Sequence, residues 1–294
     1  MDENEWLTER FEEHRTGLRA VAYRMLGSVS EADDAVQEAW LRLNRADTSG
    51  VENLAGWLTT VVARVCLNML RSRESRREQP LDVHLPDPII SHEDGGDPEQ
   101  ETLLADSVGL ALLVVLDTLT PAERLAFVLH DMFAVPFDEI APMIERSPAA
   151  ARQLASRARR RVQGSAPPPD PDLTRQREVV DAYFAAVRDG DFDALVAVLH
   201  PEVVLRSDGG TARARQTVVI RGARDVAAQA VMATRLAPFV RPARINGTAG
   251  VVAIARGRAF AVMAFTVAQG KIVAIDVLAD PDRLHELDLA VLDD

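Results

Sequence analysis

Residues 116–162 hold the most constraining pattern in this chain, three short helical segments separated by tight turns. Thr120 can cap the first helix, because Pro121 suits the first helical position and Glu123 stands where a capping-box partner belongs. A second helix of about residues 137–144 is too short to be stable alone. The three segments must therefore pack against one another.

The third helix of this stretch begins after Ser147 and carries five arginines and no acidic residue. A short helix, a tight turn and a basic helix are typical of the helix-turn-helix, whose second helix enters the DNA major groove. Arginine suits that role because its planar fork binds phosphate or the guanine edge bidentately. The competing interpretation is a solvated basic helix end, since arginines in a last turn also complement the helix dipole.

Length and cysteine content limit the class of protein. A chain of 294 residues suggests two or three domains, and 47% hydrophobic residues suffice for packed cores. The single cysteine, Cys66, excludes an internal disulfide and a cysteine-based zinc site. The sequence has no metal-ligand cluster and no phosphate-binding glycine loop, so we expect neither a metal nor a cofactor. Without a signal peptide or an apolar run of membrane length, a cytoplasmic location is expected.

The net charge of −12 is unevenly distributed along the chain. Residues 78–106 contain nine acidic and no basic residues, whereas arginines concentrate at 64–77 and 146–161. Two basic helix ends on an acidic body favour local, steered contact with nucleic acid over general adhesion to it.

Two amphipathic helices are predicted near the amino terminus, the first ending at Gly27. We expect Ser30 to begin the second, with Asp33 as its cap partner. Asp34 and Glu38 lie one turn apart on the outer face and repel each other mildly. A solvated helix face and a site for a basic partner explain this acidic pair equally well.

The next helix has the cleanest periodicity in the chain. Its apolar residues follow the helical repeat without a break from Leu54 to Leu70. Arg64, Asn68 and Arg71 fall on one polar stripe. Such a stripe can hold phosphates and read bases by hydrogen bonding.

Two stretches rich in proline divide the rest of the chain. Residues 78–106 are interpreted as an acidic linker without its own core, and residues 166–171 mark a second boundary. Beyond that boundary helices come first and strands dominate afterwards, which indicates an α+β domain. The expected strands are 203–206, 217–221, 251–256, 259–267 and 272–278, with a hairpin turn at Gln269-Gly270.

The blocks SEADDAVQEAWLRL and WLTTVVARVCLNMLRSRESRR resemble the second conserved region of extracytoplasmic-function (ECF) sigma factors, and LDTLTPAERLAFVLHDMF with SPAAARQLASRARRR resembles their fourth. The resemblance covers roughly the first 165 residues and implies core RNA polymerase and promoter DNA as partners. The implied contacts are Asp34, Gln37 and Glu38 with core polymerase, Arg64, Asn68, Arg71 and Arg73 with the minus-ten element, and Arg152, Gln153, Ser156 and Arg157 with the minus-thirty-five element.

The carboxy-terminal part resembles the SnoaL-like cone of those ECF sigma factors that carry a fused domain. Leu85-Pro86, Asp208-Gly209-Gly210 and Asp280–Leu284 are partial matches to three short signatures of that group. A short tether keeps this domain at high effective concentration near the sigma domains, so we expect it to regulate by intramolecular contact. The expected regulatory interface is Asp208, Gly209, Gly210, Asp280, Pro281, Asp282 and Arg283.

SnoaL relatives also include cyclases and isomerases that use a carboxylate or a histidine in the cone. Asp276 shares a strand face with Ile272 and Leu278, where desolvation would raise its pKa, as general acid–base catalysis often requires. His200 is a candidate partner, but no second group is placed beside Asp276 by the sequence pattern. A structural aspartate without catalysis is therefore the favoured interpretation, and a ligand in the cone stays open.

The predicted fold is multidomain, with two all-α sigma domains, the second a helix-turn-helix, followed by an α+β SnoaL-like cone with a curved antiparallel sheet. The predicted function is that of a sigma factor modulated by its fused domain. The alternatives are a helix-turn-helix transcription regulator and a SnoaL-type cyclase or isomerase with a DNA-binding appendage. The predicted domains are 1–77 (region 2), 78–106 (acidic linker), 107–165 (region 4), 166–174 (proline-rich linker) and 175–294 (SnoaL-like).

Overall fold

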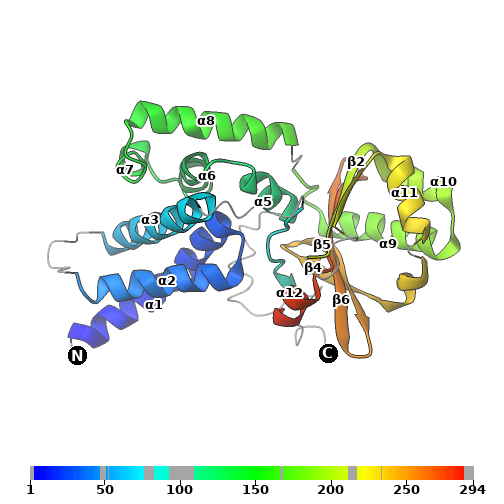
Figure 1. Cartoon of the computed structure of the whole chain (residues 1–294), viewed down its shortest axis with the longest axis horizontal. Coiled ribbons are helices and arrows are strands. Elements are labelled where there is room, and N and C mark those ends of the chain that lie inside the picture. The colour runs from blue at the N-terminus through cyan, green and yellow to red at the C-terminus, as the bar shows by residue number, and fades with distance from the viewer. Residues whose placement is uncertain are drawn as a thin grey trace. The chain divides into compact units, whose positions relative to one another are not determined.

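The computed structural model describes residues 3–46, 51, 53–75, 83–92, 109–165, 168–210, 217–232 and 234–287 (Figure 1). Residues 1–78 and 113–165 form one compact unit, the helical unit, and residues 79–112 and 166–294 form another, the sheet unit. The domain boundaries expected near residues 78, 106 and 166 lie outside the described residues, so those boundaries stay predictions.

The first part of the helical unit consists of three helices that pack through their apolar faces. Gly27 follows the first of them with φ 72°, which ends that helix as expected. The third buries Leu58, Val62 and Cys66 on its inner face, so the uninterrupted periodicity is confirmed as a core stripe. The helices are α1 (Glu3–Leu26), α2 (Val29–Leu43) and α3 (Leu54–Ser75).

The predicted cap of α2 is wrong. The helix begins at Val29, with Ser28 in the extended conformation before it and without a side-chain cap. Asp33, expected to cap Ser30, instead accepts from Arg19 of α1 at 2.6 Å. Arg19 offers a full positive charge and two hydrogen bonds, at 2.6 Å to Oδ1 and 3.1 Å to Oδ2, whereas a capping bond offers one backbone N–H, which explains why Asp33 pairs with α1.

The second part of the helical unit holds the three segments that form the helix-turn-helix. The capping box is confirmed, since Glu123 N donates to Thr120 Oγ1 at 3.4 Å and Thr120 N donates to the Glu123 carboxylate at 3.3 Å. Ser147 caps the last helix through a bond from Ala150 N at 3.2 Å. The elements are α5 (Leu110–Asp117), α6 (Pro121–Phe127), the π-helix η1 (Val128–Met132), α7 (Phe137–Ile140) and α8 (Pro148–Ser165).

The middle helix is shorter than predicted. It ends at Ile140 instead of residue 144, because Pro142 offers no N–H to continue the ladder and Glu145 adopts φ 54°. Its single turn is held from outside, since the Phe137 ring stacks on His130 with ring centroids 3.8 Å apart. This agrees with the expectation that it cannot stand alone.

Helix α6 also packs on α3 and, through Arg124, on α1, within the same unit. The side chain of Arg124 is buried and its Nε donates to the carbonyl of Arg24 at the end of α1, at 3.1 Å. Asp117 forms an ion pair with the same guanidinium. No sequence signal predicts this contact, because Arg124 sits among ordinary charged residues of a short helix.

The sheet unit is built on seven strands in the order β1-β4-β5-β6-β7-β2-β3. The β2–β7 pair is parallel and the other described pairs are antiparallel, so the expected sheet is present with one parallel pairing. Register shifts in three of the pairings mark bulges, which bend strands. The strands are β1 (Ile90–Ser91), β2 (Leu199–Asp208), β3 (Val218–Arg221), β4 (Val240–Ile245), β5 (Thr248–Ala255), β6 (Arg258–Ala268) and β7 (Lys271–Leu278).

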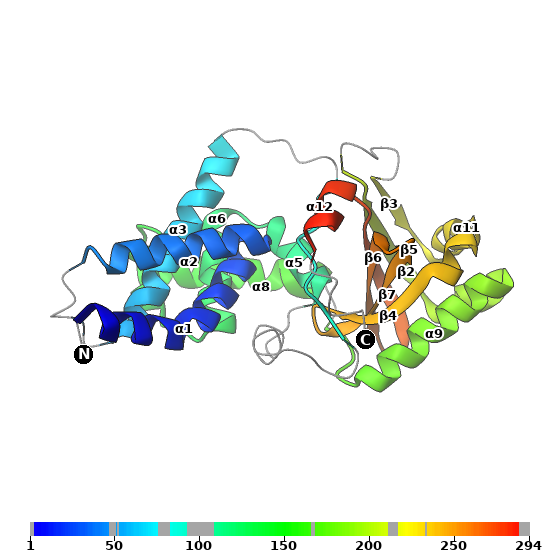
Figure 2. The ribbon, with the colours of Figure 1, turned by 90° about the horizontal axis from the view of Figure 1, so that it is seen from below.

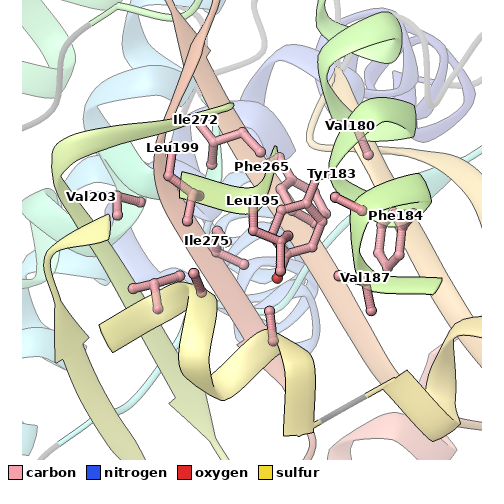
Figure 3. Packing of buried hydrophobic residues seen from close by; sticks show 14 of the residues in the cluster. Val180, Tyr183, Phe184, Val187, Leu195, Leu199, Val203, Phe265, Ile272 and Ile275 are labelled. Carbon is pink, nitrogen blue, oxygen red and sulfur yellow. The ribbon is translucent and has the colours of Figure 1, made fainter. Parts of the chain in front are cut away.

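Helices α9, α10 and α11 cover one face of this sheet, and the short α12 lies at the other (Figures 1 and 2). The core of the larger layer centres on Phe265, against which Tyr183 and Phe184 pack edge-on (Figure 3). Gln269 and Gly270 have positive φ, which confirms the hairpin turn between β6 and β7. The helices are α9 (Leu173–Asp189), α10 (Phe192–Val198), α11 (Ala223–Met232), the 3-10 helix η3 (Thr234–Phe239) and, on the other face, α12 (Pro281–Glu286).

Two strands were not predicted. β4 has Pro242 and two arginines in it, a composition that does not favour a strand, yet it pairs with β5 over its whole length. β1 comes from the acidic segment expected to be a linker, where Ile90 pairs with Ile245 of β4. That segment has no core of its own, as expected, but residues 83–92 pack against the sheet unit and bury Leu85 and Ile90 there.

Candidate functional site

The polar stripe of α3 is exposed as predicted, with one exception. Arg64, Asn68 and Arg71 all lie in solvent on one face of the helix. Arg73 does not join them, because it forms an ion pair with Glu31 and donates to the carbonyl of Leu26 at 3.2 Å. Three of the four proposed minus-ten residues are thus brought together, and the fourth holds α3 to α1 and α2.

The acidic face of α2 carries an apolar residue that sequence reasoning missed. Asp34 and Gln37 are exposed, and Glu38 is half-buried and paired with Arg42 at 2.9 Å. Leu41 continues this face and is 41% exposed. Its position one turn beyond Gln37 was the available signal, since it falls outside the buried stripe of the helix.

Helix α8 presents the four predicted minus-thirty-five residues on its outer face. Arg152, Gln153, Ser156 and Arg157 are exposed, while the alanines at 151, 155 and 158 are buried beneath them. Small residues on the inner face let α8 pack closely on α6. The outer face is accordingly free for a partner in the described structure of this unit.

The arginines of α8 are held in different ways. Arg152 lies over the Phe137 ring, with its guanidinium carbon 5.3 Å from the ring centroid. Arg157 Nε donates to Glu123 Oε1 at 3.1 Å, which ties it to α6. Arg159 is bonded in the same way to Asp131, at 2.7 Å.

Glu123 is therefore both a helix cap and an anchor for the basic helix. Burial raises its pKa, but hydrogen bonds from Thr120 and the positive charges of Arg161 and Arg157 outweigh burial and lower it overall. The carboxylate stays ionised at neutral pH, where it orients Arg157.

The signature residues of the sheet unit converge on the segment expected to be a linker. The guanidinium of Arg283 in α12 donates to Asp87 at 2.6 Å, to Asp208 at 2.9 Å and to the carbonyl of Leu85 at 2.6 Å. Asp208 also accepts from the backbone N–H of Leu85 at 3.0 Å. We name this arrangement of Leu85, Asp87, Asp208 and Arg283 the linker-docking site.

Apolar burial adds to these polar bonds. The side chain of Leu85 is fully buried, a change worth roughly 1.5–3 kcal/mol relative to exposure. At the other end of the segment, Ile89 N donates to Asn246 Oδ1 at 3.1 Å and Asn246 N returns a bond to Ile89 O at 2.8 Å. The segment is thus fixed at both ends.

The remaining signature residues support this site from behind. Gly210 has φ 60° and donates from its N–H to Asp208 Oδ1 at 3.0 Å, and a Cβ at this position would collide with Asp280. Asp280 caps α12 by accepting from Asp282 N at 3.0 Å, with Pro281 at the first helical position. The exposed carboxylate of Asp282 takes no part in the described bonds of the site, although the signature match predicted it there.

Gly209 directly follows β2, and its N–H donates to Thr217 Oγ1 at 3.1 Å. What sequence reasoning missed is that the signature residues contact residues 83–92. The available signal was that Leu85-Pro86 belongs to the same set of three signatures as Asp208-Gly209-Gly210 and Asp280–Leu284.

Asp276 is buried and paired. Burial raises its pKa, and the charge of Arg206 together with its hydrogen bond at 2.8 Å partly offsets that rise. His200 is bonded to the backbone N–H of Glu202 at 3.2 Å. The structure therefore gives Asp276 an arginine as its partner.

Metal-binding and membrane-spanning features are absent from the described ranges. Among those residues, no group of three or more His, Cys, Asp or Glu side chains could hold a metal ion. None of the described helices is both long and apolar enough to cross a membrane.

Comparisons with known proteins match two parts of the chain to family models and the whole chain to relatives. Residues 10–76 match the family model of sigma-70 region 2, and residues 109–162 match that of sigma-70 region 4. The chain is 40% identical to the ECF RNA polymerase sigma factor SigJ of Mycobacterium tuberculosis, over 93% of this chain and 91% of that protein. It is 36% identical to the probable ECF RNA polymerase sigma factor SigI of the same species, over 98% of each chain.

A solved structure is similar over nearly the whole length. The crystal structure of the Mycobacterium tuberculosis ECF sigma factor SigJ superimposes with a TM-score of 0.76 at 36% sequence identity, and the match covers 95% of this chain and 98% of that one. The similarity thus includes the sheet unit as well as the helical unit.

Proposed function

This chain belongs to the ECF RNA polymerase sigma factors, which direct promoter-specific transcription initiation. We propose that its sheet unit controls that activity by holding the linker between regions 2 and 4. The observation that carries the proposal is the bonding of one guanidinium, that of Arg283, to Asp87, Asp208 and the Leu85 carbonyl.

Core polymerase binds, in this proposal, to the outer face of α2. Asp34, Gln37 and Glu38 supply charge and hydrogen bonds, and the exposed side chain of Leu41 supplies an apolar centre. Interfaces are commonly built this way, with a small apolar core inside a polar rim. The exposure and spacing of these four residues support a docking face.

Promoter DNA is bound through two separate helices. On α3, the stripe of Arg64, Asn68 and Arg71 contacts the minus-ten element, and on α8 the outer face contacts the minus-thirty-five element. Arg152 is the best candidate for base reading, because no acidic side chain of the described structure pairs with it, whereas Arg157 is bonded to Glu123. Arg73 is assigned a structural role.

Docking of the linker limits how far α3 can lie from the sheet unit. At roughly 3.3 Å per residue, the chain from Ser75 to Val83 spans only about 26 Å. The whole chain from the end of α3 to the start of α5 could span about 110 Å, more than the roughly 85 Å between promoter elements about 25 base pairs apart on B-DNA. Control by docking therefore acts through the sheet unit, which is kept within this short reach of region 2.

Single-round transcription with purified core polymerase tests this control. Arg283→Ala should raise the yield from one defined promoter severalfold, because it leaves the carboxylates of Asp87 and Asp208 without their shared cation and weakens docking. Asp282→Asn is the matched control, since it removes a neighbouring exposed charge and should change the yield little. Equal yields from all three proteins, each shown to be folded, would overturn the control proposal without affecting the sigma assignment.

We assign Asp276 to the structure of the sheet and not to a reaction. Its partner Arg206 neutralises it inside the sheet, as buried charges require. Asp276→Asn should leave transcription within about twofold of the parent protein. A small-molecule turnover that this substitution abolishes would contradict the assignment.

A further inference from the structure

The sheet unit contains a strongly basic stretch that the proposed function does not use. Between Asp225 and Asp276 the sequence has no acidic residue and carries five arginines and one lysine. The chain as a whole has a net charge of −12, so this excess of positive charge is local. A local excess of arginine on an acidic protein indicates a polyanionic partner.

Strand pairing brings part of this charge to one end of the sheet. Ala255 of β5 pairs with Arg258 of β6, and Ala253 pairs with Val240 of β4, the neighbour of Arg241. A register shift between Ala253 and Ile254 leaves Phe260 as the extra residue of a bulge on β6. Phe260 thus lies next to Arg258 along β6, at the end of the sheet where β4 begins beside Arg241.

A second phenylalanine completes an aromatic pair. The ring of Phe239 lies 6.2 Å from that of Phe260, at an interplanar angle of 77°. Phe239 is 43% exposed and its neighbour Leu236 is 46% exposed, whereas the core residue Phe265 is fully buried. Exposed aromatic surface beside cationic side chains is typical of proteins that stack bases.

The arginines are exposed and lie on a strand, a tight turn and a 3-10 helix. Arg256 and Gly257 both have positive φ and form the tight turn between β5 and β6, from which Arg256 and Arg258 extend into solvent. Arg235 in η3 and Arg241 are exposed too. Within the described ranges, these four guanidinium groups form no ion pair.

We propose that these residues, the basic-aromatic surface (Arg235, Phe239, Arg241, Arg256, Arg258 and Phe260), bind single-stranded nucleic acid. Guanidinium groups take the phosphates, and the exposed phenylalanine offers a face on which an unpaired base stacks. Duplex DNA fits less well, because its bases are already stacked and only its phosphates would meet the arginines. The proposal does not depend on the linker-docking site.

Binding to an oligonucleotide of roughly 20 nucleotides, longer than a usual single-strand site, tests the proposal on the full chain. Fluorescence anisotropy should show at least a tenfold loss of affinity in R241E/R258E. The matched control R188E/R221E reverses two exposed charges elsewhere in the sheet unit and should lose less than twofold. Phe239→Ala should lower single-strand affinity at least fivefold and leave duplex affinity within twofold.

A photo-crosslink locates the contact independently of the DNA-binding helices. p-Benzoylphenylalanine at position 239 should crosslink to the labelled oligonucleotide, and the same residue at Val219, which is 44% exposed on β3, should not. The proposal would be overturned if both double variants lost affinity equally, or if Phe239→Ala lost affinity equally for duplex and single strand. The absence of a crosslink at position 239 in a folded protein would also overturn it. So would a surface that binds an acidic peptide of residues 93–106 but no oligonucleotide.

Discussion

Arg283 and Asp87 are 196 residues apart in the sequence, and the Nη2 atom of Arg283 lies 2.6 Å from Oδ1 of Asp87. The same guanidinium reaches Asp208 at 2.9 Å, where the carboxylate is almost completely buried. A single cation is therefore shared by two carboxylates from distant segments. Because a buried carboxylate that loses its cation is costly, we expect Arg283 to control whether residues 83–92 remain on the sheet.

Hydrogen exchange should report that control directly. The amide of Leu85, which donates to Asp208, should exchange faster in Arg283→Asp than in the parent protein, and the peptide covering residues 83–92 should lose protection. Exchanging the two charges, in R283D/D87R, should restore part of it. Protection that is unchanged in the single variant would show that apolar burial and the backbone bonds of Ile89 and β1 hold the segment without Arg283.

Gly210 is predicted to be less tolerant of a side chain than Gly257. Both have positive φ, so alanine costs roughly 1–2 kcal/mol at either position. A Cβ at 257 would meet open space, whereas one at 210 would collide with Asp280, the cap of α12. Gly210→Ala should therefore lower the free energy of unfolding by a further 1–3 kcal/mol, roughly the cost of overpacking. Chemical denaturation of both variants measures the difference, and equal losses would contradict it.

The ionisation of Glu123 should make the helical unit sensitive to acid. Its pKa is lowered from the ordinary value of 4.5 in the folded state, so its contribution to stability is present above about pH 4.5 and is lost as the pH falls through the folded pKa. Glu123→Gln keeps the capping geometry but removes the charge. It should cost about 1 kcal/mol at pH 7 and flatten the dependence of unfolding on pH between 6 and 3. A parallel shift at every pH would refute the electrostatic explanation.

Arg152 should govern specificity, and Arg157 should affect stability as well. Arg152→Ala should lose roughly 1–3 kcal/mol on the preferred minus-thirty-five sequence and little on the others, so that discrimination falls. Arg157→Ala breaks the bond to Glu123 and should also lower the melting temperature. Holoenzyme binding across a panel of promoter variants checks both. A uniform loss over the panel in Arg152→Ala would reduce that residue to a phosphate contact.

Local signals in the sequence determined most of the elements. Helix caps such as Thr120 and Ser147, the apolar repeat of α3 and the turn at Gln269-Gly270 depend on residues within a few positions of each other, so a short window contains the whole cause. The exposed faces of α2 and α8 follow from the same periodicity. Their outward residues are therefore predictable from the order of amino acids alone.

Only the tertiary structure decided which distant segments meet. Asp33 pairs with Arg19 instead of capping α2, and Arg73 pairs with Glu31 instead of joining the minus-ten stripe. The buried Arg124 donates to the carbonyl of Arg24. In each case the partner comes from another helix. Strand β4 exists because β5 offers it a complete ladder, which outweighs its weak propensity. Residues 83–92, with two prolines and a single acidic residue, have no local cause for order. They are ordered because Arg283 and the sheet supply the cation, the hydrogen bonds and the apolar surface that the segment lacks.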